Sequence, residues 1–374
     1  MLKIGIVLNY KNAEKKKDEL LNVNSRKMKW LSLANNKKYN KFCILKNGKK
    51  YIPADVAIGV YLESKYPDKV TVDYITPKEI STRRFKKNHI VFVIIYDLLE
   101  SFHLSNKKNF LQYKLALKNS NNVYPPYKYQ KFINNKCNYY KYLSKKGIPV
   151  APTYCISKEK WYTRNPDTYI KNLLAKVKHN KWESIIAKPV YGQEAIDFAK
   201  FMSCEPVKGL NCKKDAIKKY LSRNVPKYKS IVIQEYIKGF DKNNPEIRTY
   251  FINGEYMYSI ITTATRVGQA VQEGGTYKFP SENWNYIRKL SQRVMDSLPK
   301  LDLPGKFKNP ILTRIDIGSG LDGVPYTYFV NEVEFVPSLY IEDQNNPVVE
   351  AISESLLGVA DVYSKAKLPI NVVF

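Results

Sequence analysis

The sequence predicts an α/β fold with two to three domains, and three observations support this prediction. The chain has 374 residues, whereas a single domain usually has roughly 100–200. Short apolar runs that are typical of strands alternate with segments of helical spacing over most of the chain. The run Ile90–Tyr96 is apolar throughout, as expected for a strand at the centre of a parallel sheet.

The first 128 residues predict an α/β domain. Its expected elements are a strand at Lys3–Asn9, a helix at Ala54–Ser64, and strands at Val70–Ile75 and His89–Tyr96. An asparagine-rich stretch at 119–122 and two prolines at 125–126 then predict a domain boundary.

Residues 129–225 and 226–374 predict two further units. In 129–225 we expect a helix over Lys131–Lys146 that ends at Gly147, a strand within 183–190 and a helix over Asp215–Ser222. In 226–374, Asn253 and Gly254 lie between two strand-like runs, which strongly predicts a β-hairpin. The remaining expected elements are a strand in 230–237, a helix at Trp284–Leu298, strands in 311–318 and 326–336, and a helix at Val348–Tyr363.

The chain is strongly basic, with 62 Lys and Arg against 34 Asp and Glu, a net charge of +28. The first 128 residues hold 26 basic and 10 acidic residues (+16), so the other 246 carry +12. A chain rich in Lys, Asn and Tyr is what an AT-rich genome would encode. The alternative is a surface that attracts an acidic partner. Nucleic acid is not the expected partner, because only 10 of the basic residues are Arg and no nucleic-acid-binding module is evident.

Cysteine and histidine are informative mainly by exclusion. The five cysteines are odd in number and form no C-x-x-C pair, so we expect neither a disulfide framework nor a zinc ribbon. We therefore expect reduced thiols and a cytoplasmic protein. The three histidines are scattered, which disfavours a zinc cluster or a Ser-His-Asp arrangement. No apolar run is long enough to span a bilayer, and the apolar start is too short for a signal peptide.

Three segments place two charges two residues apart inside otherwise apolar strands. The pairs are Glu246 and Arg248, Arg314 and Asp316, and Glu332 and Glu334. Residues two apart on a strand share one face, and a single such pair would ordinarily face solvent. Carboxylates gathered on neighbouring strands repel one another unless a cation lies between them, and magnesium prefers such oxygen ligands. The pattern therefore predicts a magnesium site with basic residues nearby for phosphate.

The chain also resembles the ATP-grasp superfamily, in particular its glutathione-synthetase and ribosomal-protein glutamate ligase branch. The resemblance covers about residues 130–340 and depends on six motifs in the family's order. They are NK-x10-GIPVAPT, IIAKPVYG, IVIQEYIKG, PEIRTYFINGE, RIDIG and NEVEFVPS. It implies two α+β subdomains that grip ATP, at 129–225 and 226–374, preceded by a Rossmann-like α/β domain at 1–128.

The resemblance also implies a role for each matching residue. Lys136 and Lys188 would contact the ATP phosphates, with Lys188 also near the adenine edge. Gln234, Glu235, Tyr236 and Ile237 would form the hinge that reads adenine, and Glu246 would bind the ribose. Arg248 would face the γ-phosphate, and Arg266 would bind the substrate or intermediate. The implied ligands of one or two Mg²⁺ ions, or of Mn²⁺, are Asp316, Glu332 and Glu334.

The sequence departs from the family pattern at three places. The segment after Lys188, which is usually glycine-rich and closes over phosphate, contains only Gly192. The last metal position, commonly asparagine, is Glu334. The loop between Asp316 and Glu332 is long, and these two residues oppose each other only if its turn is centred near residue 324.

The resemblance implies an ATP- and Mg²⁺-dependent ligase that joins a carboxylate to an amine, or to a thiol, through an acyl phosphate. Its substrates would be a small-molecule or peptide carboxylate and an amine, with an acidic character suggested by the basic first domain. A homodimer is left open. The alternatives are a kinase of a polyanionic small molecule on the same scaffold and a non-enzymatic ATP-binding protein.

Overall fold

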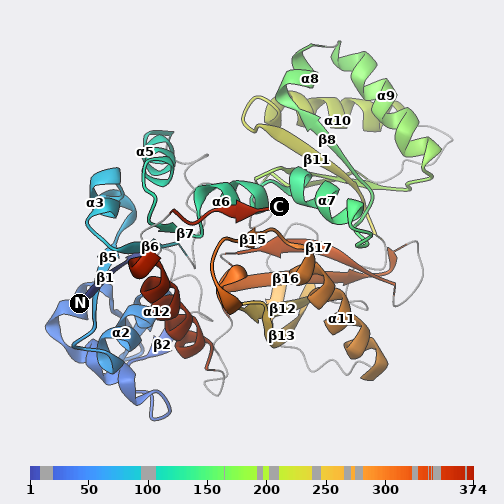
Figure 1. Cartoon of the computed structure of the whole chain (residues 1–374). Coiled ribbons are helices and arrows are strands. Elements are labelled where there is room, and N and C mark those ends of the chain that lie inside the picture. Colours follow the sequence, from blue (N-terminus) through green and yellow to red (C-terminus); the bar gives the residue numbers. More distant parts are fainter. Residues whose placement is uncertain are drawn as a thin grey trace.

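The computed structural model shows three bodies, each built on a β-sheet (Figure 1). The structure describes residues 1–8, 20–93, 107–163, 165–191, 197–201, 210–237, 246–264, 271–273, 281–321, 327–335, 337, 339, 347–366 and 369–374. None of the described helices is long and apolar enough to cross a membrane.

The first body is a parallel four-stranded sheet with helices on both faces, which confirms the predicted α/β domain. Its strand order is β5 (Val70–Ile75), β1 (Leu2–Val7), β6 (Ile90–Phe92), β7 (Val123–Tyr124). β6 pairs in parallel with both neighbours, as its apolar sequence predicts. One face packs against α2 (Ala54–Lys65) and α12 (Val348–Ala366), and the other against α3 (Thr82–Lys86) and α5 (Lys107–Lys118). Beside it lies a small antiparallel sheet of β2 (Leu20–Asn22), β4 (Lys49–Pro53) and β3 (Ile44–Lys46).

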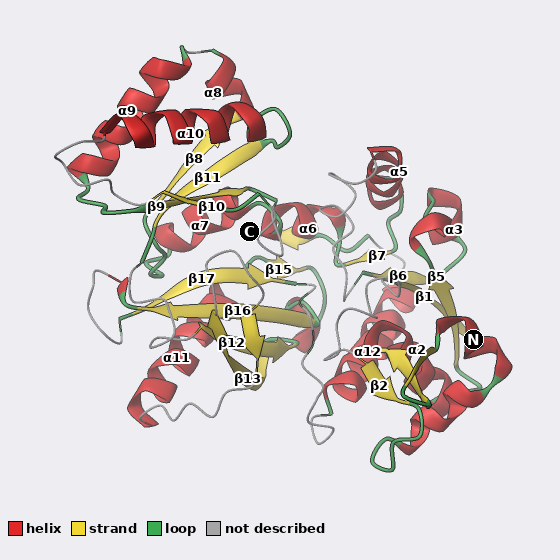
Figure 2. Ribbon diagram, turned by 180° about the vertical axis from the view of Figure 1, so that it is seen from behind, coloured by secondary structure: helices red, strands yellow, loops and turns green. Residues whose placement is uncertain are grey.

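The second body is an antiparallel sheet with three helices packed on one face, away from the third body (Figure 2). Its strand order is β10 (Ala199–Phe201), β9 (Ile185–Pro189), β11 (Ser230–Glu235), β8 (Thr153–Ser157). The helices are α8 (Lys158–Tyr162), α9 (Pro166–His179) and α10 (Leu210–Asn224). In β9 the buried Ile185 and Ala187 point to these helices, so Ile186 and Lys188 point to the opposite face.

The third body is an antiparallel sheet packed on α11 (Ser281–Ser297). Its strand order is β14 (Val271–Glu273), β13 (Glu255–Ala264), β12 (Glu246–Ile252), β16 (Leu312–Ser319), β17 (Tyr328–Glu334). The predicted hairpin is confirmed between β12 and β13, because Asn253 and Gly254 both have positive φ, 52° and 85°. Outside this sheet, β15 (Lys300–Leu301) pairs with β18 (Val372–Val373).

One predicted helix is in fact two. The sequence predicts a single helix over 131–146, whereas α6 (Tyr127–Ile133) and α7 (Lys136–Lys145) are separate. The Asn135 side chain accepts a hydrogen bond from the Asn138 amide at 3.1 Å. An asparagine cap of this kind starts a new helix, so Lys136 is the first residue of α7.

The expectation of reduced cysteines is also wrong. Cys137 on α7 and Cys155 on β8 form a disulfide, with Cα atoms 6.1 Å apart. The two residues are 18 positions apart and share no motif, so only the packing of α7 against β8 brings them together. Cys43 is a half-buried free thiol.

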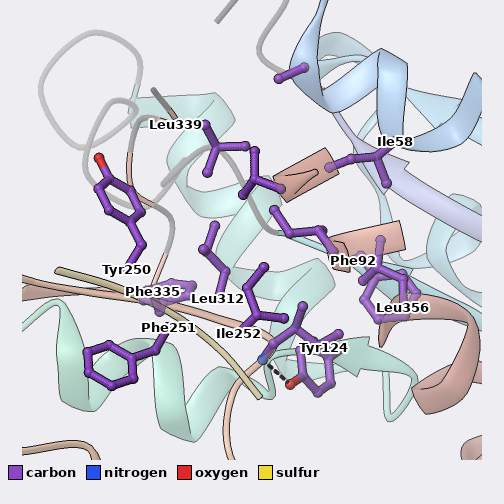
Figure 3. Close-up of a cluster of buried hydrophobic side chains, with 14 of the residues drawn as sticks. Ile58, Phe92, Tyr124, Tyr250, Phe251, Ile252, Leu312, Phe335, Leu339 and Leu356 are labelled. Atoms are coloured by element: carbon purple, nitrogen blue, oxygen red, sulfur yellow. Dashed lines mark hydrogen bonds between the residues drawn. The ribbon is translucent and has the colours of Figure 1, made fainter. Parts of the chain in front are cut away.

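A continuous apolar core joins the first body to the third (Figure 3). Ile58 and Leu356 from α2 and α12 belong to the same cluster as Leu312 and Phe335 of the third body. The Tyr124 hydroxyl accepts a hydrogen bond from the Ile311 amide at 2.7 Å across this junction. The final helix, α12, therefore packs on the first body, although it follows the third in sequence. The domain ranges 1–128, 129–225 and 226–374 stay a proposal.

Candidate functional site

The charged pairs predicted from the sequence lie in adjacent rows across the third sheet. Arg248 of β12 pairs with Asp316 of β16, which pairs with Glu332 of β17. In the next row Tyr250 pairs with Arg314, and Arg314 with Glu334. Asp316 and Glu332 oppose each other, and the segment 322–326, in which the turn between them is expected, lies outside the described residues.

The alternation of the strands decides which face carries the charges. Thr249, which lies between Arg248 and Tyr250 on β12, is fully buried, and its hydroxyl donates to Ser291 of α11 at 3.1 Å. Arg248, Asp316 and Glu332 therefore lie on the opposite face, away from α11. The apolar residues between them fix this orientation, because reversing it would bury the charges against α11.

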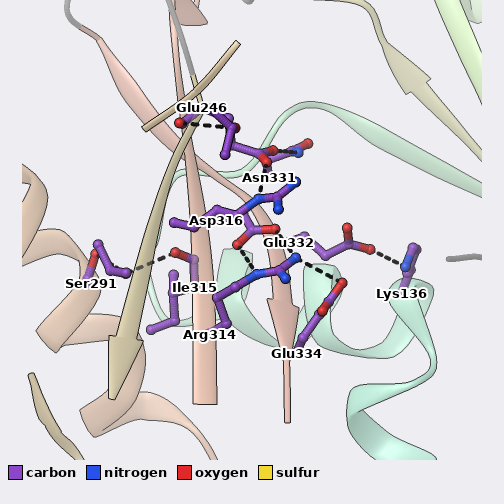
Figure 4. A network of polar contacts seen from close by, with 12 residues as sticks. Lys136, Glu246, Ser291, Arg314, Ile315, Asp316, Asn331, Glu332 and Glu334 are labelled. Atoms are coloured by element: carbon purple, nitrogen blue, oxygen red, sulfur yellow. Dashed lines mark hydrogen bonds and ion pairs between the residues drawn. The ribbon is translucent and has the colours of Figure 1, made fainter. Parts of the chain in front are cut away.

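Three carboxylates converge on this face (Figure 4). Oxygen atoms of Asp316, Glu332 and Glu334 lie within 4.8 Å of one another. Asp316 is 1% exposed, and the other two residues are half-buried. Closely placed carboxylate oxygens are the donor set that Mg²⁺ prefers, so the residues present fit a divalent cation.

Basic side chains surround the three carboxylates. The Arg314 guanidinium donates two hydrogen bonds to Asp316, at 2.7 and 2.8 Å, and lies 3.1 Å from Glu334. The Lys136 ammonium, at the start of α7, forms an ion pair with Glu332. These contacts bring α7 and the third sheet together at the site.

The pKa values of the carboxyl groups diverge because burial and neighbouring charges compete. Burial raises the pKa of Asp316 to about 7, against the opposing effect of Arg314. Burial and the charge of Glu332 raise the pKa of Glu334, although Arg314 opposes this. The pKa of Glu332 is instead lowered to about 2: burial acts to raise it, but Lys136 and Lys188 outweigh that effect. Of the three carboxylates, Glu332 is therefore the one whose negative charge is most strongly stabilised.

A second polar chain connects the third sheet to the second body. The Arg248 guanidinium donates to Glu246 at 3.0 Å, and the Asn331 amide donates to the other Glu246 oxygen at 2.7 Å. The Tyr140 hydroxyl of α7 donates to the Asn331 carbonyl at 2.5 Å and accepts from the Lys188 ammonium at 3.1 Å. Lys188 and Glu246, predicted to contact different parts of one nucleotide, are thus linked through two intervening residues, Tyr140 and Asn331.

The predicted hinge, residues 234–237, runs from β11 toward the third sheet. The Gln234 side chain is buried and donates to the Thr153 hydroxyl at 2.9 Å, so it braces β8. The Tyr236 amide donates to the Ser184 carbonyl at 3.0 Å, which extends the pairing with β9. Ile237 packs on Phe329 of β17. The segment therefore joins the second and third bodies beside the charged face.

The structure places most of the predicted site residues together at this junction, but it does not describe all of them. Arg266 and Gly192 lie outside the described residues. Arg314, Asn331 and Tyr140 were not predicted as site residues. Arg314 could have been predicted as a site residue, because it lies two residues before Asp316 on the same face of the strand. Tyr140 and Asn331 have no such signal, because long-range packing brings them to the site.

No protein-family model and no curated protein matches the sequence. Solved structures do match along nearly the whole chain. D-cycloserine synthetase DcsG has a TM-score of 0.60 at 15% identity, over 95% of this chain and 99% of that chain. D-alanine–D-alanine ligase from Bacillus anthracis, in complex with ATP, has a TM-score of 0.53 at 15% identity, over 96% and 99%. VanG D-Ala:D-Ser ligase from Enterococcus faecalis has a TM-score of 0.54 at 12% identity, over 96% and 99%.

The fold is that of the ATP-grasp ligases. The similarity to these structures confirms the predicted fold class. At identities this low, the similarity shows the fold alone. The narrower branch named from the sequence is not confirmed by these structures.

Proposed function

We propose that this protein is an ATP- and Mg²⁺-dependent ligase that joins a carboxylate to an amine through an acyl phosphate. One observation carries the proposal: three carboxylates within 4.8 Å of one another, surrounded by Arg248, Arg314, Lys136 and Lys188 at the junction of two sheets. Convergent carboxylates with basic residues around them suit a metal–triphosphate group. The ATP-grasp fold supports the same conclusion.

In the proposed complex, Asp316, Glu332 and Glu334 hold Mg²⁺, or Mn²⁺ in its place. The ion neutralises negative charge on the phosphates. Lys136 and Lys188 contact the phosphates as charge-assisted donors. Glu246 accepts hydrogen bonds from the ribose, and the backbone of Glu235 and Ile237, with Gln234 and Tyr236 beside it, reads adenine.

The proposed reaction has two steps and needs no side-chain nucleophile. A carboxylate oxygen of the first substrate attacks the γ-phosphorus of ATP and displaces ADP, which gives an acyl phosphate. The amine of the second substrate then attacks the acyl carbon, loses a proton and displaces phosphate. Arg248 faces the transferred phosphoryl group and Arg266 the acyl intermediate, where they offset the developing negative charge. A thiol could replace the amine.

The proposed substrates are a small-molecule or peptide carboxylate and an amine. The glutathione-synthetase and ribosomal-protein glutamate ligase branch remains part of the proposal on the sequence motifs alone. A cytoplasmic location also remains a prediction, and the Cys137–Cys155 disulfide argues against it, because disulfides persist mainly in oxidising compartments.

A kinase is the second candidate, because the +16 charge of the first 128 residues would suit a polyanionic acceptor. The decisive experiment is mass spectrometry of reactions that contain the protein, ATP, Mg²⁺ and pooled amino acids, peptides and inositol phosphates. A ligase forms ADP, phosphate and a condensation product, and only when both substrates are present. Transfer of the phosphoryl group to a stable acceptor would identify a kinase. ATP binding without any product would leave a non-enzymatic ATP-binding protein.

A further inference from the structure

Lys200, on β10, lies on the same face of the second sheet as Lys188. Lys200 pairs with Ile186 of β9, and cross-strand partners point to the same face. Ile186 and Lys188 are two residues apart, and both point away from the helices. The neighbours of Lys200 on β10, Ala199 and Phe201, pack instead on the helix-side core. This alternation directs the Lys200 side chain toward the charged face.

The Lys200 ammonium lies over the ring of Tyr236, 3.2 Å from its centroid. Tyr236 pairs with Ser184 through its amide, and Ser184 is two residues before Ile186, so the Tyr236 side chain is on this face too. Lys200 and Tyr236 flank β9 from its two sides and meet over it. Lys200 forms no ion pair among the described residues, and its side chain is half-buried.

We propose that Lys200 is a nucleobase-contacting residue that the Tyr236 ring holds in position. This inference rests on the proposed function, which places the base of ATP along residues 234–237. A base seated there lies beside the Lys200 ammonium, which offers three hydrogen-bond donors and no acceptor. The ring nitrogens of adenine are acceptors, so the ammonium stabilises the bound base. The cation–π contact with Tyr236 keeps the flexible lysine side chain near the base when no ligand is bound.

The test compares Lys200→Met with a matched control, Lys176→Met. The control lysine also lies over a tyrosine ring, that of Tyr154, at 4.9 Å. Tyr154 pairs with Ile233 and packs on the helix-side core, so the control pair is on the opposite face of the same sheet. Affinities of the full chain for Mg²⁺–ATP and for Mg²⁺–tripolyphosphate are measured by calorimetry, and folding of both variants is checked by thermal melting.

We expect Lys200→Met to weaken ATP binding at least fivefold and to leave tripolyphosphate binding unchanged, and Lys176→Met to change neither. Unchanged ATP affinity in a folded Lys200→Met variant would overturn the inference. Equal weakening of ATP and tripolyphosphate would overturn it too, because it would place the lysine at the phosphates. If the unmodified protein binds no ATP, the proposed function fails and the inference fails with it. That outcome is distinct from the other two.

Discussion

Replacing Glu332 by glutamine tests the metal site with the least change in shape. The pKa of this carboxyl is lowered from 4.5 to about 2, because Lys136 and Lys188 outweigh the effect of burial. At 1.36 kcal/mol per pKa unit, a shift of this size corresponds to folding stability on the order of 3 kcal/mol at neutral pH. Because the folded-state pKa is the lower one, this contribution is complete above pH 4.5. It is lost as the pH falls from 4.5 toward 2.

Glu332→Gln should therefore lose up to about 3 kcal/mol of unfolding free energy at pH 7. The difference from the unmodified protein should shrink as the pH falls from 4.5 toward 2. Denaturant titrations at pH 7, 4.5 and 3 measure both effects. Asp316→Asn would be a poorer probe, because Asp316 is buried and holds Arg314 through two hydrogen bonds. Breaking a buried pair of that kind costs about 3–5 kcal/mol.

The same variant should lose most of its metal affinity. Two unit charges 4.8 Å apart, the limit that encloses these carboxylate oxygens, interact by about 3.5 kcal/mol at an effective dielectric constant of 20. A divalent ion among the three carboxylates lies closer than that to each of them, so the loss of one ligand charge should cost at least about 2.7 kcal/mol, a hundredfold in affinity. The metal affinity is measured by titration with Mn²⁺ in the presence of saturating ADP, with free Mn²⁺ detected by electron paramagnetic resonance.

Glu159→Gln is the control, because Glu159 is exposed on α8, on the helix side of the second sheet. It should bind Mn²⁺ like the unmodified protein. If Glu332→Gln also binds Mn²⁺ with unchanged affinity, the assignment of Glu332 as a metal ligand is wrong. An unchanged acid stability profile would refute the ion pair with Lys136.

Two further predictions concern Lys188 and the disulfide. Lys188→Ala should weaken ATP binding at least tenfold, about 1.4 kcal/mol, because it removes a charge-assisted phosphate contact. Unchanged affinity by calorimetry would refute the phosphate contact and assign Lys188 to its hydrogen bond with Tyr140. Cys137→Ser should lower the unfolding free energy by about 3 kcal/mol, as the chain-entropy model gives for a loop of this length, because the paired cysteines are separated by 18 positions. Cys43→Ser, at the free thiol, should have little effect in the same denaturant titration, and equal effects of the two variants would exclude a stabilising disulfide.

Local patterns in the sequence predicted four strands of the third sheet, β12, β13, β16 and β17, and the charged face they carry, whereas β14 was not predicted. Charges two apart in apolar strands at 246–248, 314–316 and 332–334 require a single polar face, because strand side chains alternate. The Asn253–Gly254 turn then fixes the pairing of β12 with β13, since both residues adopt the positive φ that such turns demand. Short-range rules were sufficient here because alternation and turn geometry are properties of a few consecutive residues.

Contacts between distant segments were not predictable in the same way. The Cys137–Cys155 bond depends on how α7 docks on β8, and nothing in the spacing of the cysteines encodes that docking. The split between α6 and α7 did have a local signal: Asn134 and Asn135 interrupt the helical pattern, and asparagine is a preferred helix cap. The packing of α12 on α2, about 290 residues earlier, again follows from tertiary structure and not from any nearby pattern.

The charge balance of the site gives a reason for Glu334, which departs from the ATP-grasp pattern. The resemblance to ATP-grasp ligases predicts asparagine at the last metal position, where this chain has Glu334. The additional negative charge lies 3.1 Å from Arg314, which also binds Asp316. With Lys136, Lys188 and Arg248, the described part of the site holds four cations against four carboxylates, since Glu246 is the fourth. The formal charges of these eight groups cancel, so they give the site no net attraction for a triphosphate, and the two positive charges of the metal ion supply it. Loss of a metal ligand should therefore weaken ATP binding as well as metal binding, and the Glu332→Gln variant is where the two losses should appear together.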